Sequence, residues 1–237
     1  MIWIRSLLFT AVFYIASTIA ALLMTPLLLA PRRWTVIAIG IWARFVTVAM
    51  RVICGIRVEI RGREHMPAGP ALIGAKHLCM FDTIGPFGFL HDACFVLKKE
   101  LLVIPFYGWY SLKGGMIAVD REGHASALKK LVRDARERLS EDRQVIIFPE
   151  GTRKDPGAQP DYKPGVAALY RDLGLPCTPL ATNSGVHWPA HGFLRRPGVI
   201  VFEFLEPIPA GLKRGEFMKQ LEDRIETATN ALLAEGL

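Results

Sequence analysis

The first 58 residues contain no aspartate or glutamate, and the first carboxylate of the chain is Glu59. Residues 1–57 carry six arginines, whereas the remaining residues carry 23 basic and 22 acidic side chains. A nucleic-acid-binding protein spreads its basic excess over a folded domain. A basic and apolar N-terminus instead favours attachment to an anionic lipid surface, so we expect a membrane lipid bilayer as a partner and no nucleic acid.

Cysteines are few, and none of them belongs to a CxxC pair. This spacing predicts reduced, mostly structural thiols in the cytosol. A charged fraction of 22% excludes disordered and fibrous classes. The 237 residues suffice for one medium-sized domain with an appendage, and a mean hydropathy of +0.27 indicates that the appendage is a membrane segment.

An uncharged run from Leu7 to Ala30 has 24 residues and would form a helix of about 36 Å, enough to cross a hydrocarbon core of about 30 Å. A cleaved signal peptide is the alternative, but its apolar core is shorter and precedes a small-residue cleavage site. Here Pro31, Arg32 and Arg33 follow, and another apolar stretch begins. We therefore expect the segment to be retained, with the two arginines on the cytoplasmic side.

The second apolar stretch, Trp34 to Ile56, contains Arg44 and Arg51. At about 100° per residue, these two side chains and Arg33 lie within about 20° of one another on a helix. A single basic stripe favours a helix in the headgroup layer, because a second span would bury two arginines in hydrocarbon. Residues 1–56 are predicted to be membrane-anchoring helices, followed by a domain over residues 57–237.

From Arg57 onward, short apolar segments alternate with amphipathic ones, which predicts an α/β domain. The expected fold is a mixed, mostly parallel sheet flanked by helices. The expected helices are Ala125–Ser140, Gly165–Leu173, Phe217–Leu233 and a short one after Asp82. The expected strands are Val58–Arg61, Ala71–Ala75, Cys94–Leu97, Met116–Val119, Val145–Phe148, Cys177–Ala181 and Val199–Phe204.

A histidine and an aspartate lie at the end of one predicted strand. His77 follows the apolar strand, and Asp82 comes five positions later, just before a predicted helix. A strand-to-helix turn can bring the two side chains together. The aspartate would then fix the imidazole tautomer and leave the other ring nitrogen as a general base. The ordinary alternative is a helix-capping aspartate beside an unrelated histidine.

The segment Phe148-Pro-Glu-Gly-Thr-Arg153 follows a second predicted strand. Ligands usually bind at the carboxyl edge of an α/β sheet. Glu150 can accept hydrogen bonds from hydroxyl groups, and Arg153 can bind phosphate bidentately. Arg121, at the end of another predicted strand, is a second candidate for phosphate. The alternative is a tight turn with a solvated arginine.

Taken in order, these blocks resemble the glycerolipid acyltransferase family, typified by lysophosphatidic acid acyltransferases. The first block is the His-x4-Asp of His77 and Asp82, the third is the complete Phe148–Arg153 segment, and the fourth is the Pro-bearing strand Leu175–Leu180. The second block consists of Lys98, Glu100, Pro105, Gly108 and Arg121. Lys76 and Cys79 depart from the family pattern, which often has Asn before the histidine and Ser two residues after it.

The resemblance implies direct acyl transfer without a bound cofactor or a metal. His77, oriented by Asp82, would deprotonate the free hydroxyl of lysophosphatidic acid. That hydroxyl would attack the thioester of acyl-CoA or of an acyl carrier protein, giving phosphatidic acid. The implied location is a membrane, the bacterial inner membrane, with the catalytic domain on its cytoplasmic face.

The resemblance also implies roles for the substrate-binding residues. Arg121 and Arg153 would hold the acceptor phosphate, with Lys98 as a third cation. Glu150 and Gly151, with Thr152 of the same block, would shape the glycerol site. The aromatic residues of the second block region are expected in the wall and core beside an acyl groove, and they are Phe106, Tyr107, Trp109 and Tyr110.

Several alternatives remain open at this stage. The same chemistry could act on another lysophospholipid or on an ornithine-type lyso-lipid. The chain could also be a non-catalytic lipid-binding membrane protein, or a hydrolase that uses water as the acceptor. Cys79 is expected to be a packed side chain and not a nucleophile. His187 and His191 have a spacing that could hold a metal, but Pro189 argues for a loop there. Arg195 and Arg196 are expected to form a solvated or lipid-facing pair.

Overall fold

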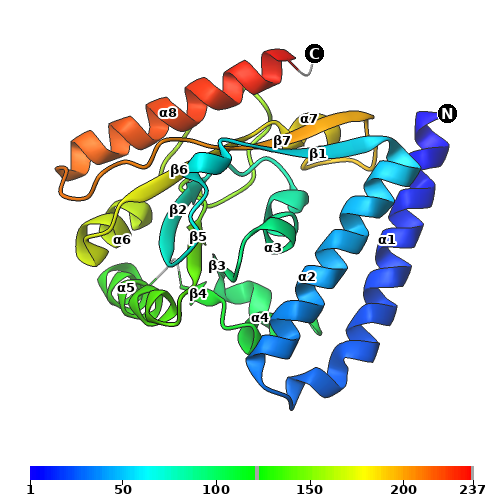
Figure 1. The fold of residues 1–237 in the computed structure, drawn as a ribbon, viewed down its shortest axis with the longest axis horizontal. Helices are drawn as coiled ribbons and strands as arrows, with labels where there is room; N and C mark the ends of the chain where they lie inside the picture. Colours follow the sequence, from blue (N-terminus) through cyan, green and yellow to red (C-terminus); the bar gives the residue numbers. More distant parts are fainter. Residues whose placement is uncertain (121–122, 236–237) are drawn as a thin grey trace.

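The computed structural model describes residues 1–120 and 123–235, which form a helical hairpin beside an α/β domain (Figure 1). The hairpin consists of α1 (Ile2–Met24), the short 3-10 turn η1 (Thr25–Leu28) and α2 (Arg32–Ala49). A π-helical turn, η2 (Met50–Cys54), leads from α2 into the first strand of the domain. Gly55 adopts a left-handed conformation (φ +72°) at this junction, which lets the chain turn sharply from helix to strand.

The domain is built on a seven-stranded sheet in the order β1-β7-β6-β2-β5-β3-β4. Neighbouring strands are parallel, except that β6 and β7 pair antiparallel. This arrangement confirms the predicted mixed, mostly parallel sheet, and every predicted strand is present with ends shifted by at most two residues. The strands are β1 (Ile56–Arg61), β2 (Ala71–Ala75), β3 (Ala93–Lys98), β4 (Ile117–Val119), β5 (Gln144–Ile147), β6 (Cys177–Thr182) and β7 (Gly198–Phe204).

The central strands are covered on both faces. All four residues of β5 and all six of β6 are buried, which explains why both strands are mainly apolar. Successive side chains of a strand point to opposite faces. Leu72 of β2 therefore joins the core beneath α5, α6 and α8, whereas Ile73 joins the core on the side of the hairpin.

The predicted long helices are present, and some short ones lie beyond what periodicity predicts. Asp82 itself lies in a 3-10 turn, and α3 supplies the short helix expected after it. Helices α4 and α7 have seven and four residues, which is too short for an apolar stripe to be recognised. The helices of the domain are α3 (Pro86–Phe89), α4 (Tyr107–Lys113), α5 (His124–Ser140), α6 (Gly165–Leu173), α7 (Ser184–His187) and α8 (Arg214–Glu235). The 3-10 turns of the domain are η3 (Arg63–His65), η4 (Met80–Thr83) and η5 (Lys99–Val103).

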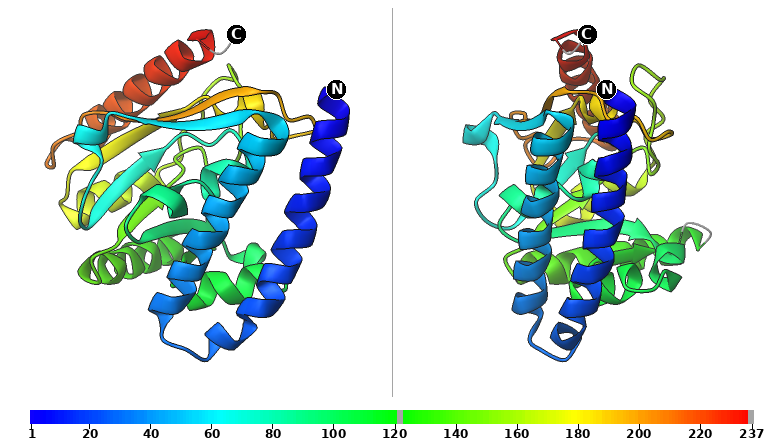
Figure 2. Two further views of the ribbon diagram at one scale, coloured as in Figure 1. Left: turned by 45° about the vertical axis from the view of Figure 1, so that its right-hand side comes forward. Right: turned by 90° about the vertical axis from the view of Figure 1, so that its right-hand side faces the viewer.

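The hairpin runs along the side of the domain, as Figure 2 shows from two directions. Phe9 and Phe13 of α1 pack edge-on against Trp188 with ring centroids 5.3 and 5.6 Å apart. Near the other end of α1, the Tyr110 hydroxyl donates to the Ala21 carbonyl at 2.6 Å. Most of the remaining hairpin surface is exposed and apolar, and both helices are long and apolar enough to cross a membrane.

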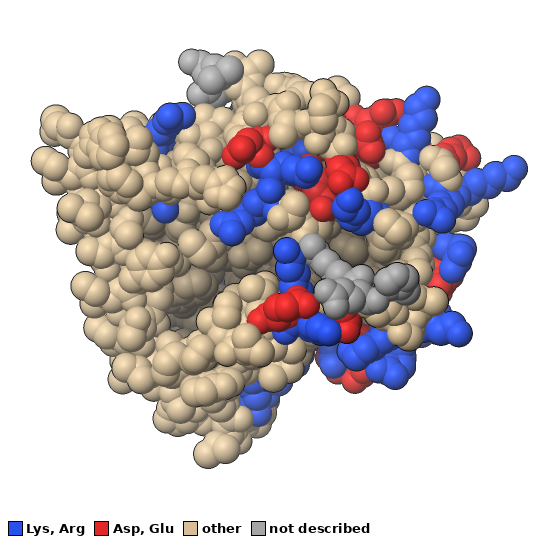
Figure 3. All heavy atoms as spheres, turned by 180° about the vertical axis from the view of Figure 1, so that it is seen from behind, with Lys and Arg blue, Asp and Glu red and all other residues tan. Residues whose placement is uncertain are grey.

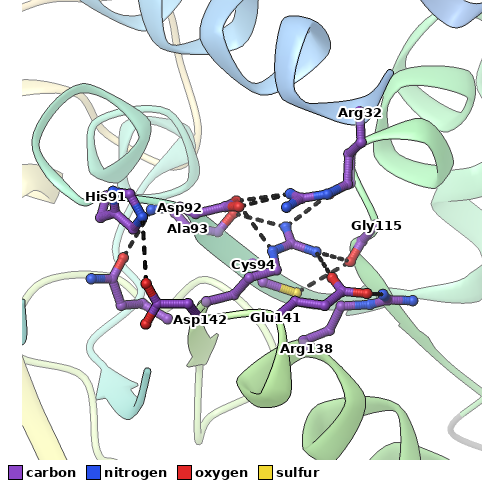
Figure 4. Close-up of polar contacts among 12 residues, drawn as sticks. Arg32, His91, Asp92, Ala93, Cys94, Gly115, Arg138, Glu141 and Asp142 are labelled. Atoms are coloured by element: carbon purple, nitrogen blue, oxygen red, sulfur yellow. Dashed lines mark hydrogen bonds and ion pairs between the residues drawn. The ribbon is translucent and has the colours of Figure 1, made fainter. Parts of the chain in front are cut away.

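A buried ion-pair network ties the start of α2 to the sheet (Figure 4). Arg32 contacts Asp92 at 2.8 Å, just before β3. Arg143, fully buried before β5, contacts the same carboxylate at 3.1 Å and donates to the Gly115 carbonyl at 2.9 Å. The hairpin is thus fastened to the domain at both ends, by aromatic packing at one and by charge at the other.

Candidate active site

The site begins where β2 ends. His77 and Asp82 are brought together by the turn that leads from β2 into η4, and the His77 Nδ1 lies 3.2 Å from the Asp82 Oδ2. The Asp82 side chain is almost fully buried, at 1% exposure, whereas His77 keeps 13%. Because an ionised carboxylate only accepts hydrogen bonds, Nδ1 carries the proton of the neutral ring. Nε2 is then left to accept a proton.

Asp82 is held by groups on both sides of its carboxylate. Oδ2 accepts the backbone N–H groups of Leu78 at 2.6 Å and Cys79 at 2.8 Å. Oδ1 accepts the Ser184 hydroxyl at 2.5 Å. These hydrogen bonds fix the orientation of the carboxylate, so Asp82 is placed to stabilise a positive charge on the imidazole.

Ser184 is a site residue that sequence reasoning missed. It lies in α7, directly after β6, and β6 is the sheet neighbour of β2. Carboxyl ends of adjacent parallel strands meet at one edge of the sheet, so Ser184 reaches Asp82 across 102 residues of sequence. The polar Asn-Ser pair after the Pro-bearing strand was the available signal, but the strand order was needed to use it.

The neighbouring strand β5 supplies the wall behind the histidine. The His77 ring stacks on Phe148 with centroids 4.0 Å apart and an interplanar angle of 18°. The backbone N–H of Lys154 donates to the His77 carbonyl at 2.9 Å. Gly151 has φ +65°, a conformation that turns the Phe148–Arg153 segment back toward the cavity.

The two residues that depart from the family pattern both point into the domain interior. The Lys76 ammonium group is 3% exposed and contacts the Glu150 Oε1 at 2.9 Å. Burial raises the pKa of Glu150, and the Lys76 charge opposes that shift. The Glu150 carboxylate is thus engaged inside the domain through Oε1, its Oε2 is buried without a hydrogen-bond partner among the described residues, and Glu150 does not line the cavity that His77 lines. Cys79 is fully buried, and burial raises the pKa of its thiol well above the usual range.

A large, mostly apolar cavity of about 1160 Å³ lies between the hairpin and the domain. It is larger than the roughly 300–1,000 Å³ of usual small-molecule sites. His77 lines it together with the predicted substrate residues Lys98, Gly151, Thr152 and Arg153. Arg121 lies outside the described residues. The aromatic and apolar walls include Phe13, Tyr14, Trp42, Met80, Phe106, Tyr107, Tyr110 and Phe148.

Charge is distributed unevenly around this cavity. Figure 3 shows lysine and arginine side chains gathered over the α/β domain beside the hollow, whereas the hairpin shows few charged groups on this face. Lys98, Arg153 and Lys163 reach the cavity from the charged side. One opening thus offers cations for an anionic headgroup and an apolar interior for a hydrocarbon chain.

Arg195 and His187, two candidate residues outside the catalytic segment, are both buried. The predicted solvated or lipid-facing pair is wrong for Arg195, which is buried at 7% exposure with its guanidinium 4.5 Å from the Trp188 ring centroid, whereas Arg196 is exposed. The aromatic face compensates part of the desolvation of that charge. His187 is also buried, with Nδ1 3.1 Å from the Arg196 carbonyl oxygen. Within residues 1–120 and 123–235, no three His, Cys, Asp or Glu side chains are grouped closely enough to hold a metal.

Comparison with known proteins gives consistent matches. Residues 57–183 match the family model described as Acyltransferase. A 1-acyl-sn-glycerol-3-phosphate acyltransferase of Pseudomonas aeruginosa is 37% identical over 194 residues, covering 82% of this chain and 76% of that protein. The human 1-acyl-sn-glycerol-3-phosphate acyltransferase alpha is 30% identical over 143 residues, covering 60% of this chain and 50% of that protein.

A solved structure resembles the whole chain. It is the crystal structure of the 1-acyl-sn-glycerophosphate (LPA) acyltransferase PlsC from Thermotoga maritima, with a TM-score of 0.78. The match covers 98% of both chains at 24% sequence identity. At this identity the match concerns the fold, including the hairpin.

Proposed function

Because the chain belongs to the acyltransferase family, we propose that it transfers an acyl group to the free hydroxyl of lysophosphatidic acid, forming phosphatidic acid. The donor would be the thioester of acyl-CoA or of an acyl carrier protein. The observation that carries the proposal is the His77–Asp82 pair, whose histidine lines an apolar cavity that Arg153 and Lys98 also line. Relatives named 1-acyl-sn-glycerol-3-phosphate acyltransferase support the choice of acceptor.

The reaction we propose needs one general base. Nε2 of His77 takes the proton of the acceptor hydroxyl while the hydroxyl oxygen bonds to the thioester carbonyl carbon. The tetrahedral intermediate then collapses, the C–S bond breaks, and the leaving thiolate takes the proton from Nε2. Asp82 stabilises the imidazolium between these two steps. General-base help contributes about 10²–10⁴-fold, and positioning in the cavity supplies much of the remainder.

The cations at the cavity set the direction in which an acceptor enters. The phosphate of lysophosphatidic acid would lie against Arg153 and Lys98, and Arg121 is a predicted third partner. Its acyl chain would lie against the apolar walls, which include Phe13 and Tyr14 of α1. The hydroxyl between headgroup and chain would then face His77. A water acceptor would gain nothing from this division, which favours transfer over hydrolysis.

We also propose that the hairpin lies in one leaflet and does not cross the bilayer. α1 contacts the domain near both of its ends, through Phe9 and through Ala21. A hairpin that crossed the membrane would therefore carry the flank of the domain into hydrocarbon. Arg33 and Arg44 of α2 and Arg51 of η2 are all exposed, which suits the headgroup layer. A location on the cytoplasmic face of the bacterial inner membrane stays a prediction.

An acceptor panel tests the function. The purified full chain, in lipid vesicles, is given a radiolabelled acyl-CoA or acyl carrier protein with lysophosphatidic acid, another lysophospholipid, a lyso-ornithine lipid or no lipid. We expect labelled phosphatidic acid from lysophosphatidic acid, and we expect His77→Ala to lower turnover at least about 10²-fold while the thermal transition persists. If the acyl group were transferred only to an acceptor lipid that lacks phosphate, the acceptor assignment would be contradicted. If the acyl donor were consumed at the same rate with and without acceptor lipid, the result would indicate a hydrolase. If His77→Ala kept full activity, His77 would not be the general base.

A further inference from the structure

A cluster of charges lies on the inner side of the catalytic segment, away from the cavity. The Lys76 ammonium group contacts the Glu150 Oε1 at 2.9 Å and both carboxylate oxygens of Glu226, at 2.7 and 2.9 Å. The Tyr162 hydroxyl donates to the Glu226 Oε1 at 2.9 Å. The side chains of Lys76, Glu150 and Glu226 are 3%, 1% and 17% exposed, so the cluster is largely shielded from water.

The cluster joins the two strand ends that carry the catalytic histidine and its wall. The Lys76 N–H continues the ladder with β6 by donating to the Leu180 carbonyl at 2.9 Å. Consecutive residues of an extended segment point to opposite sides. His77 therefore faces the cavity and stacks on Phe148, while Lys76 faces inward and pairs with Glu150. The ends of β2 and β5 are thus connected twice, by a ring stack on the outside and an ion pair on the inside.

Glu226 brings a third element into this arrangement. It lies on α8, 150 residues beyond Lys76, and it is the second carboxylate on the same ammonium group. Through Tyr162 it also holds the loop that leads to Lys163, whose side chain lines the cavity. One buried cation between two carboxylates is stable only if each partner stays in place, because a lost contact leaves a buried charge unpaired. The position of α8 is therefore coupled to the active-site wall.

We propose that Lys76 and Glu226 are positioning residues for acyl transfer: through them, α8 sets the distance between the His77 segment and the Phe148–Arg153 turn. This inference rests on the proposed function. Neither side chain touches a reacting atom in this scheme. Both act by holding the imidazole at the place where the acceptor hydroxyl and the thioester meet, and small displacements of a general base reduce turnover strongly.

Paired substitutions at Glu226 separate positioning from simple stabilisation. Glu226→Ala removes both contacts, whereas Glu226→Gln keeps the shape and the hydrogen-bonding oxygen. Asp223→Asn is the matched control, because Asp223 is an exposed carboxylate one turn earlier on α8. We expect Glu226→Ala to lower kcat about tenfold per folded molecule with both KM values within about threefold of the wild type, and Glu226→Gln to restore kcat to within about threefold. Asp223→Asn should have the same kcat and KM values as the wild type.

Lys76→Met gives a second test on the other side of the contact. We expect its kcat to fall at least as far as that of Glu226→Ala, and the double variant Lys76→Met/Glu226→Ala to be no worse than the poorer single variant, because both break the same connection. If Lys76→Met does not fold, the comparison of Glu226→Ala with Glu226→Gln still tests the positioning role. A kcat that stays at the wild-type value in Glu226→Ala, with only the melting temperature lowered, would overturn the proposal. Equal losses in Asp223→Asn would overturn it as well.

A readout that does not use the reaction keeps this inference separate from the proposed function. Diethyl pyrocarbonate modifies accessible neutral imidazoles, and mass spectrometry assigns the modified site to His77. We expect Glu226→Ala to change the rate of His77 modification and Glu226→Gln to preserve the wild-type rate. If the wild-type protein transfers no acyl group to any lipid, the proposed function fails while this rate still tests the positioning. An unchanged rate of His77 modification in Glu226→Ala would contradict the positioning role of Glu226.

Discussion

Replacing Asp82 by asparagine separates the charge of this side chain from its hydrogen bonds. An amide oxygen at the place of Oδ2 can still accept the N–H groups of Leu78 and Cys79, which lie at 2.6 and 2.8 Å. The amide NH2 at the place of Oδ1 can donate to the Ser184 oxygen. The turn should therefore keep its geometry, and the main loss is the negative charge next to His77.

The size of that loss follows from the distance. With about 4–5 Å between charge centres and an effective dielectric constant of about 20, a carboxylate and an imidazolium attract each other by about 3–4 kcal/mol. The imidazolium exists only after proton abstraction, so the attraction acts on the transition state and not on the resting enzyme. Asp82→Asn should lower kcat by roughly 10²- to 10³-fold, with little change in the KM of either substrate.

The assay is initial-rate acyl transfer in lipid vesicles, expressed per folded molecule, with a thermal melt of the same sample. Asp92→Asn is the matched control, because Asp92 is a largely buried aspartate paired with Arg32 and Arg143 outside the cavity. Asp92→Asn should lower the melting temperature and leave kcat at the wild-type value. A folded Asp82→Asn protein with kcat within about threefold of the wild type would refute the role of this charge.

Three further predictions concern other parts of the site. Arg153→Ala should raise the acceptor KM about tenfold or more, since a charge-assisted hydrogen bond contributes about 1.5–3 kcal/mol; Arg133→Ala on α5 is the control, and an unchanged KM contradicts the phosphate role. Cys79→Ala should keep kcat within about threefold, because burial raises the pKa of the thiol and keeps it protonated; inactivation of a folded sample would point to a nucleophile. Burial lowers the pKa of His187 from its usual 6.5, so the unfolded chain binds the proton more readily and the stability of the fold decreases as the pH drops through about 6.5. In thermal melts, His187→Gln should reduce this loss of stability at low pH. The same pH dependence in His187→Gln and the wild type would contradict the assignment to His187.

Much of the architecture is encoded locally. Short, mainly apolar segments such as Ala71–Ala75 predicted every strand, and for the central strands the reason is that burial on both faces favours apolar side chains whichever strand is the neighbour. The stripe of Ala125–Ser140 predicted α5 to within one residue. The spacing of His77 and Asp82 allowed their contact but left a helix-capping aspartate as the alternative, and the structure shows Asp82 in both roles.

Contacts between distant segments could not be predicted in this way. Ser184 and Glu226 lie 102 and 150 residues from their partners, and their contacts depend on the order of strands in the sheet and on the face that α8 covers. Arg195 was predicted to be solvated or lipid-facing, as part of a pair with Arg196, whereas in the structure it is buried against Trp188, which itself packs on α1.

By itself, the sequence determined the class of fold, the apolar hairpin and the chemical groups available to the site, because each depends on residues close together in the chain. Tertiary structure alone decided which of those groups face the cavity. Consecutive residues of a strand point to opposite sides, so His77 lines the cavity while Lys76 is buried against Glu150. Which side becomes cavity and which becomes core is set by the helices that pack there, and those come from parts of the chain far from the motif.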